Sequence, residues 1–178
     1  MTARCLARRV RRTAPGAPAR APGLVVALGA LLVCTGCGYG FAAGANRMPA
    51  GARRVFVRPL ENWTTDAEVG GLVAASLRRE LARRDADGGP KAPARIEGAV
   101  EQVSFGASSP NGATYRVALV VSARLVVNGV VLAEQRARRE EDWLAGQDPL
   151  ESEGRRHLAL RRAADAIARE IIDRFEQP

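Results

Sequence analysis

The stretch TYRVALVVSARLVVNGVVLAEQRARREE, residues 114–141, decides the fold of this chain. Asn128 and Gly129 separate two apolar runs, and both central residues of a type I′ turn need positive φ, so this dipeptide predicts a β-hairpin. The period of two before it predicts a strand over residues 115–127, and residues 130–141 form its partner. One alternating set is apolar and must face the core: Tyr115, Val117, Leu119, Val121, Leu125 and Val127.

The opposite set of the same strand is only half polar. It contains Arg116 and Arg124, but also Ala118, Val120 and Val126. An apolar second face can be a surface that another molecule covers. Scattered valines on an ordinary surface explain the pattern equally well, because folded proteins expose many apolar atoms.

The segment before this hairpin predicts a strand, a loop and a helix. Residues 54–58 alternate as a short strand that a proline ends, and a polar loop follows at 61–64. Apolar residues then recur at helical intervals, which predicts a helix over 66–84. Thr65 and Glu68 have the spacing of a capping box at its start.

Two further segments complete the predicted order β-α-β-β-β-α. Residues 94–105 predict a strand, the turn residues 108–112 fold it onto the next strand, and 150–177 predict a long helix. We expect an α+β fold, a two-layer sandwich in which two helices pack on a mostly antiparallel four-stranded sheet. The apolar stripe of the long helix is Leu160, Ala164, Ile167, Ile171 and Phe175.

The N-terminal segment has the features of a lipoprotein export signal. Residues 1–20 are rich in arginine and free of acids, and residues 24–33 form an apolar run. That run is too short to span a bilayer, which needs ~20 residues, but it fits a signal peptide. The tetrapeptide 34–37, Cys-Thr-Gly-Cys, resembles a lipobox, although Cys34 stands where leucine is usual and leaves open whether processing is altered. We expect a signal peptide at 1–36, a lipidated tether at 37–52 and the folded domain at 53–178.

Cys37 is therefore the expected lipidation site. A diacylglycerol with a further N-linked acyl chain, typically palmitate, anchors a protein stably, whereas one chain holds it only reversibly. Gly38 follows Cys37, where aspartate signals inner-membrane retention in enterobacteria, and this favours the outer membrane. Two alternatives are a free Cys37 after a conventional signal and a buried core helix in place of the signal.

The net charge of +8 belongs mostly to the signal. Six arginines and no acids precede Cys37, so the remainder has 21 basic and 19 acidic residues, or +2. The basic pI therefore gives no support for nucleic-acid binding. The six are Arg4, Arg8, Arg9, Arg11, Arg12 and Arg20.

No constellation of residues predicts catalysis or a metal site. His157 is the only histidine and lies beside arginines, as an exposed helical histidine would. The acidic run 140–142 directly follows two arginines, which is typical of a solvated charged surface. Cys37 is the only cysteine after the signal, so no disulfide can form within the mature monomer. We expect no enzyme activity and no cofactor besides the covalent lipid.

With its elements placed, the mature chain resembles the lipopolysaccharide-assembly lipoproteins of the LptE family. Order and spacing carry the resemblance, which extends from Cys37 to Pro178. The matching segments are Cys37-Gly38-Tyr39, residues 55–62 (VFVRPLEN), residues 77–81 (LRREL), the hairpin at 128–129 and residues 171–175 (IIDRF).

The resemblance implies a plug inside the outer-membrane barrel LptD, which helps that barrel assemble and contacts lipopolysaccharide (LPS), with the domain facing the periplasm or the barrel lumen. Guanidinium groups bind lipid A phosphates well, and Arg116 and Arg124 are the candidates for this contact. They equally fit a role in keeping the sheet soluble. The rival hypothesis is an accessory lipoprotein, pilotin-like or a scaffold, of another envelope secretion machine; a lipoprotein hydrolase is a more remote one.

Overall fold

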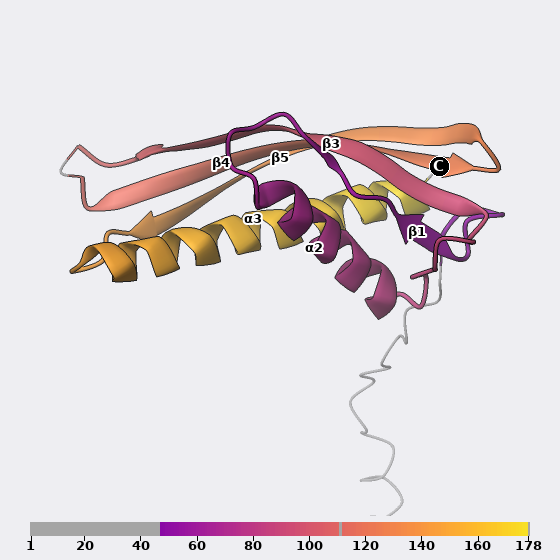
Figure 1. Ribbon diagram of the computed structural model, residues 1–178, viewed down its shortest axis with the longest axis horizontal. Helices are drawn as coiled ribbons and strands as arrows, with labels where there is room; N and C mark the ends of the chain where they lie inside the picture. The colour runs from indigo at the N-terminus through magenta and orange to yellow at the C-terminus, as the bar shows by residue number, and fades with distance from the viewer. Residues whose placement is uncertain (1–46, 111, 178) are drawn as a thin grey trace, which may run out of the picture. The chain divides into compact units, whose positions relative to one another are not determined.

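The computed structural model describes residues 47–110 and 112–177 (Figure 1). The predicted signal peptide and Cys37 lie outside these residues. The elements in chain order are β1 (Val55–Val57), β2 (Glu61–Asn62), α2 (Val69–Arg83), β3 (Ala94–Ala107), β4 (Thr114–Val127), β5 (Val130–Leu144) and α3 (Pro149–Glu176).

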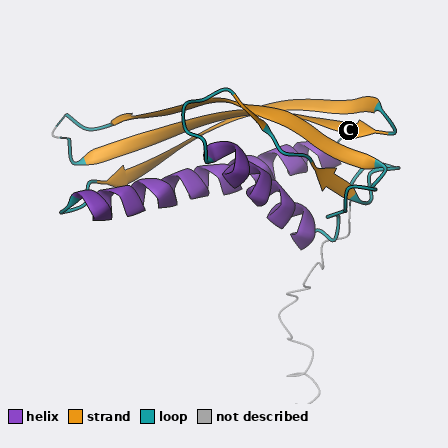
Figure 2. Ribbon diagram, in the orientation of Figure 1, coloured by secondary structure: helices purple, strands orange, loops and turns teal. Residues whose placement is uncertain are grey.

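The five strands form one sheet in the order β1-β3-β4-β5, with β2 also paired to β3. β1 and β2 run parallel to β3, and the two long pairings β3–β4 and β4–β5 are antiparallel. Both helices lie against one face of the sheet (Figure 2). The predicted α+β two-layer fold is confirmed, with one strand more than the four expected.

The additional strand is β2, which the sequence analysis assigned to a loop. Its polar residues Glu61 and Asn62 carry no apolar alternation, so sequence gave no sign of a strand there. The pairing is made by the backbone: Trp63 N donates to Val100 O at 3.0 Å, while Arg58 N donates to Ile96 O at 3.0 Å. The chain after β1 therefore continues to run beside β3 as far as Trp63.

The structure confirms the predicted hairpin turn and the predicted set of side chains that point toward the helices. Asn128 and Gly129 have φ values of +49° and +86°, and Val127 pairs with Val130 across them. Most of the predicted inward set is buried against the helices. Tyr115 is the exception, 36% exposed, because it lies at the end of the strand and its ring stacks on Trp143 at a centroid distance of 5.5 Å.

The helices agree with prediction at their apolar faces and differ at one cap. α2 begins at Val69, and its N-cap Glu68 makes no side-chain cap, so the predicted capping box is wrong. Asp66 Oδ1 instead accepts a hydrogen bond from Glu68 N at 3.2 Å. In α3, Asp148 Oδ1 accepts from Glu151 N at 2.8 Å, and the predicted apolar stripe is buried.

A charged cluster joins the two helices at one end. Arg84 contacts Glu80 and Asp173 at 2.8 and 2.6 Å, and Glu176 at 2.9 Å. Burial lowers the pKa of Arg84, but its hydrogen bonds to Asp173, Glu80 and Glu176 outweigh burial and raise the pKa. Glu80 is 5% exposed, and a buried carboxylate needs such partners.

The folded core starts before the predicted domain boundary at residue 53. Met48 and Ala52 are both buried in the hydrophobic core. Gly51 lies beside Val127, because a Cβ added to it would come 3.1 Å from Val127 Cγ1. The last residues of the predicted tether thus pack beside the turn of the β4–β5 hairpin.

Candidate functional site

The face of the sheet that the helices leave open carries both candidate arginines, and we call it the outer face. Its β4 residues are Arg116, Ala118, Val120, Ser122, Arg124 and Val126, which alternate with the buried inward set. Val120 and Val126 are nevertheless 4% and 3% exposed. These two valines therefore do not present an apolar surface to solvent.

The register shows which residues flank the two valines. Val120 lies between Gln102 and Arg138, and Val126 lies between Arg95 on β3 and Val131 on β5. Stems of arginine and glutamine can lie over apolar neighbours while their heads stay in water. Both expectations drawn from these valines, an apolar docking face and scattered exposed residues, are corrected by this burial.

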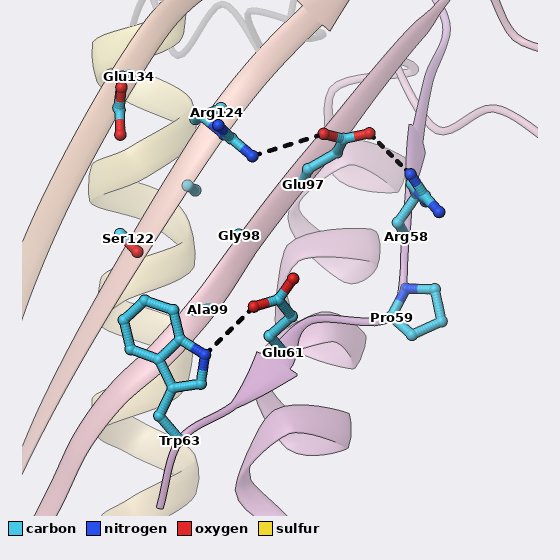
Figure 3. Close-up of a pocket in the computed structure, with 11 residues that line it drawn as sticks. Arg58, Pro59, Glu61, Trp63, Glu97, Gly98, Ala99, Ser122, Arg124 and Glu134 are labelled. Atoms are coloured by element: carbon cyan, nitrogen blue, oxygen red, sulfur yellow. Dashed lines mark hydrogen bonds and ion pairs between the residues drawn. The ribbon is translucent and has the colours of Figure 1, made fainter.

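Arg124 lies at a hollow of about 530 Å³ on the outer face (Figure 3). Its floor consists of small residues of β3 and β4, and its walls come from the β1–β2 connection and from β5. The lining residues are Arg58, Pro59, Glu61, Trp63, Glu97, Gly98, Ala99, Ser122, Ala123, Arg124 and Glu134.

The central charge of this hollow is the carboxylate of Glu97. Arg95 Nε lies 2.6 Å and Arg58 Nη1 2.9 Å from Glu97 Oε1, while Arg124 Nη2 is 3.8 Å from Oε2. Hydrogen bonds from Arg95 and then Arg58 lower the pKa of Glu97. One carboxylate is thus shared by three guanidinium groups, and the contact of Arg124 is the longest.

The rest of the hollow offers an aromatic ring and two further acids. Trp63 is 65% exposed, and its Nε1 donates to Glu61 Oε2 at 3.2 Å. Glu134 lines the β5 side. Three basic groups therefore meet three acidic ones around this hollow, so charge alone does not attract an anion to it.

Gly98 lies in the floor of the hollow, where the backbones of β3 and β4 approach closely. A Cβ built on Gly98 would lie 2.1 Å from Ser122 O and 2.9 Å from Ala123 Cα. Both neighbours are backbone atoms, which cannot turn aside as a side chain can. Glycine at this position lets β3 and β4 pair closely beneath Arg124.

Arg116 belongs to a different part of the outer face. Its Nε and Nη2 donate to Asp142 Oδ1 and Oδ2 at 2.7 and 3.0 Å, and Nη1 lies 3.3 Å from Glu140 Oε2. The hydrogen bond raises the pKa of Arg116 and lowers that of Asp142. Eight residues separate Arg116 from Arg124 along β4, roughly 26 Å. The two arginines therefore do not form one site.

The acidic run at 140–142 is divided between the two faces of the sheet. Glu140 and Asp142 lie on the outer face. Glu140 forms an ion pair with Arg138 at 2.6 Å, and Asp142 forms one with Arg116 at 2.7 Å. Glu141 pairs with the inward residue Val117. Within residues 47–110 and 112–177, no three metal-binding side chains gather as a metal site would require.

A further ion pair lies on the outer face between Arg116 and Arg124. Arg136 Nε donates to Glu101 Oε2 at 2.7 Å, and this hydrogen bond lowers the pKa of Glu101. The outer face thus carries a series of arginine–carboxylate pairs, and the arginine side chains are between 47% and 68% exposed. A phosphate that binds there competes with these carboxylates for the guanidinium groups.

Sequence reasoning missed Arg58, Arg95, Glu97 and Trp63. Arg58 and Glu97 are 39 residues apart and meet only because β1 pairs in parallel with β3. No local pattern encodes that pairing. His157, expected to be exposed, is half-buried on α3.

The described part of the chain has no helix that is long and apolar enough to cross a membrane.

Comparison with known proteins identifies the family. The sequence matches LptE, described as lipopolysaccharide-assembly, over residues 52–175. A candidate lipoprotein from Caulobacter crescentus is similar in fold, with 18% identity and a TM-score of 0.50 over 66% of this chain and 88% of its own. The rare lipoprotein B from Shewanella oneidensis has 16% identity and a TM-score of 0.41, over 66% and 91% of the two chains.

No curated protein matches the sequence. The family match nevertheless covers nearly all of the described domain, from Ala52 in the core to Phe175 on α3. LptE proteins are non-catalytic lipoproteins associated with the cell envelope. This chain belongs to the LptE family of lipopolysaccharide-assembly proteins.

Proposed function

We propose that this chain is an outer-membrane lipoprotein, anchored through acyl chains on Cys37, that acts as a plug and assembly partner of the barrel LptD. In this role it assists delivery of LPS to the cell surface. The family match over residues 52–175 is the observation that carries the proposal. The lipobox-like sequence before Cys37 supports the anchor.

The outer face supports a contact with LPS that depends on ion-pair exchange. The guanidinium group of arginine can form two parallel hydrogen bonds with a phosphate, as it does with a carboxylate. A phosphate can therefore replace a carboxylate partner without loss of hydrogen bonds. Arg124 is the better candidate, because its contact with the carboxylate of Glu97 is 3.8 Å long. Arg116 donates two hydrogen bonds to Asp142, and a phosphate that takes the place of Asp142 has to replace both.

Depletion of the protein tests the proposed role. We expect surface LPS to fall when the protein is depleted and to return with a wild-type copy, as measured by surface labelling with an LPS-binding probe. Normal surface LPS in fully depleted cells contradicts the proposal. It would favour an accessory role in another secretion machine.

Acyl labelling tests the anchor separately. The Cys37→Ala chain should incorporate no labelled palmitate and should leave the membrane fraction, because no other cysteine follows the signal. A variant that is still labelled and still sediments with membranes contradicts lipidation at Cys37.

A further inference from the structure

The hollow on the outer face has an exposed aromatic ring at one end. Trp63 is 65% exposed, and two hydrogen bonds hold it in place. Its backbone N–H donates to Val100 O at 3.0 Å, and its Nε1 donates to Glu61 Oε2 at 3.2 Å. Because the indole N–H is already bonded, the ring offers its apolar faces to a further contact. Rigid aromatic rings in such positions bury a large apolar area at a small cost in conformational freedom.

The other end of the hollow offers a hydrogen-bond acceptor. Figure 3 shows Arg124 and Glu134 there, with Ser122 between them and Trp63. Arg124 and Glu134 face each other across β4 and β5. Among residues 47–110 and 112–177, the carboxylate of Glu134 nevertheless has no hydrogen-bond or ion-pair partner. Glu134 can therefore accept hydrogen bonds from a ligand without giving up a partner.

The size and charge of the hollow narrow the class of ligand. Its volume of about 530 Å³ lies within the range of small-molecule sites, about 300–1,000 Å³. Three acids and two bases line it, so a ligand that is wholly anionic is not favoured. The acids are Glu61, Glu97 and Glu134, and the bases are Arg58 and Arg124. A suitable ligand has an apolar face for the aromatic ring and hydroxyl groups for the free carboxylate.

A sugar ring has both properties. The C–H groups on one of its faces form an apolar patch with a slight positive charge, whereas the face of an aromatic ring is negative. Its hydroxyl groups donate hydrogen bonds to carboxylates and accept them from guanidinium groups. The floor of the hollow includes Gly98 and Ala99, whose small side chains leave room for a ring beside Trp63.

We propose that the hollow binds a sugar ring, which stacks on Trp63 and donates a hydroxyl hydrogen bond to Glu134. The source of the sugar, the saccharide part of LPS, rests on the proposed function. Arg124 is left to meet a phosphate that the saccharide carries. Trp63 and Glu134 thus recognise the saccharide itself, and Arg124 recognises the charge on it.

The test measures binding of an oligosaccharide that has been released from LPS, freed of acyl chains and dephosphorylated. The full mature lipoprotein is kept in a detergent without a sugar headgroup, because a glycosidic detergent would compete for the hollow. Titration followed by saturation-transfer NMR gives the dissociation constant and shows which ligand protons approach the protein. The wild-type chain should bind, with the strongest transfer to ring protons of a sugar.

Variants of the ring and of the free carboxylate locate the site. Trp63→Leu should weaken binding about fivefold, because leucine is apolar but has no aromatic face, and Trp63→Phe should restore part of the affinity. Glu134→Ala should weaken binding about threefold. Trp143→Phe is the matched control and should bind as wild type does, because it changes the only other tryptophan. Trp143 pairs with Tyr115, roughly 30 Å along β4 from Arg124. Circular dichroism checks that each variant is folded.

Absence of oligosaccharide binding, or equal affinity in wild type and Trp63→Leu, overturns the sugar site. Tetra-N-acetylglucosamine, which resembles the glycan of the cell wall, is titrated in parallel, and tighter binding of this ligand overturns LPS as the source. Surface LPS in depleted cells reports the proposed function separately. Reduced surface LPS without oligosaccharide binding rejects this site alone, whereas normal surface LPS with oligosaccharide binding rejects the proposed function alone.

Discussion

β4 contributes to both faces of the sheet, and the two faces are built from different interactions. Toward the helices, Val117, Leu119 and Leu125 are fully buried among apolar side chains. Toward the outside, Arg116 and Arg124 pair with carboxylates of the neighbouring strands. Apolar burial stabilises far more per residue than half-exposed ion pairs do. The inner face therefore holds the fold together, and the outer face can exchange partners without loss of the fold.

Truncation on the inner face should have the largest effect. Leu119→Ala removes buried methyl groups between the sheet and the helices and should lower the free energy of unfolding by about 2–5 kcal/mol. Urea denaturation followed by circular dichroism measures this loss. Leu158→Ala, at a position 46% exposed on α3, is the control and should cost much less. Equal losses contradict the assignment of the core to this face.

A methyl group added between β3 and β4 should have the next largest effect. Gly98→Ala places a Cβ against the Ser122 carbonyl and should cost about 1–3 kcal/mol, because two backbones must separate. Gly71→Ala in α2 is the matched control: nothing lies within 4 Å of its Cβ, and alanine should stabilise the helix by about 0.5–1 kcal/mol. Thermal unfolding of both variants measures the contrast. A Gly98→Ala protein as stable as wild type contradicts the close approach of β3 and β4.

Acid should weaken the outer face before the inner face. The pKa of Glu97 is held below its ordinary 4.5 by Arg95 and Arg58, so its stabilising pairs are complete above that value. They are lost as the pH falls through the lower pKa of the folded state. Glu101 and Asp142 behave likewise. In denaturation series from about pH 6 to about pH 3, Glu97→Gln should show a shallower decline than wild type.

The control for this pH series is Glu134→Gln, which lines the same hollow and should keep the wild-type slope. An unchanged slope in Glu97→Gln would show that the three arginines near that carboxylate do not stabilise it.

The smallest effect should be on LPS affinity. Arg124→Gln should weaken binding to purified LPS by a few-fold, since one half-exposed ion pair contributes on the order of 1 kcal/mol or less. Arg116→Gln should have less effect, because Asp142 already occupies that guanidinium group. Arg162→Gln, at an exposed position on α3, serves as the charge-matched control. A larger loss for Arg162 than for Arg124 would exclude the outer face as the contact.

Local patterns predicted those parts of the fold that depend on residues near in sequence. The alternation over 115–127, the Asn128–Gly129 turn and the stripe from Leu160 to Phe175 are all found in the structure. The strand β2 was missed because parallel pairing of two polar residues leaves no period. The cap of α2 was wrong because Asp66 forms the local hydrogen bond in place of the predicted pair.

The site was predicted less completely than the fold, for the same physical reason. Arg116 and Arg124 do lie on the outer face, as the alternation implied. Their partners Asp142 and Glu97 come from other strands and were not found. Charge pairing across a sheet depends on register and strand order, which a single sequence does not specify at long range. The role of both arginines in binding LPS stays a prediction.

Purification of the tagged chain from outer membranes tests the central proposal most directly. The wild-type protein, extracted in mild detergent, should carry an LptD barrel in near-equal amount, as measured by quantitative mass spectrometry. Recovery of the folded protein without any such barrel, or with the components of another secretion machine in its place, contradicts the plug role.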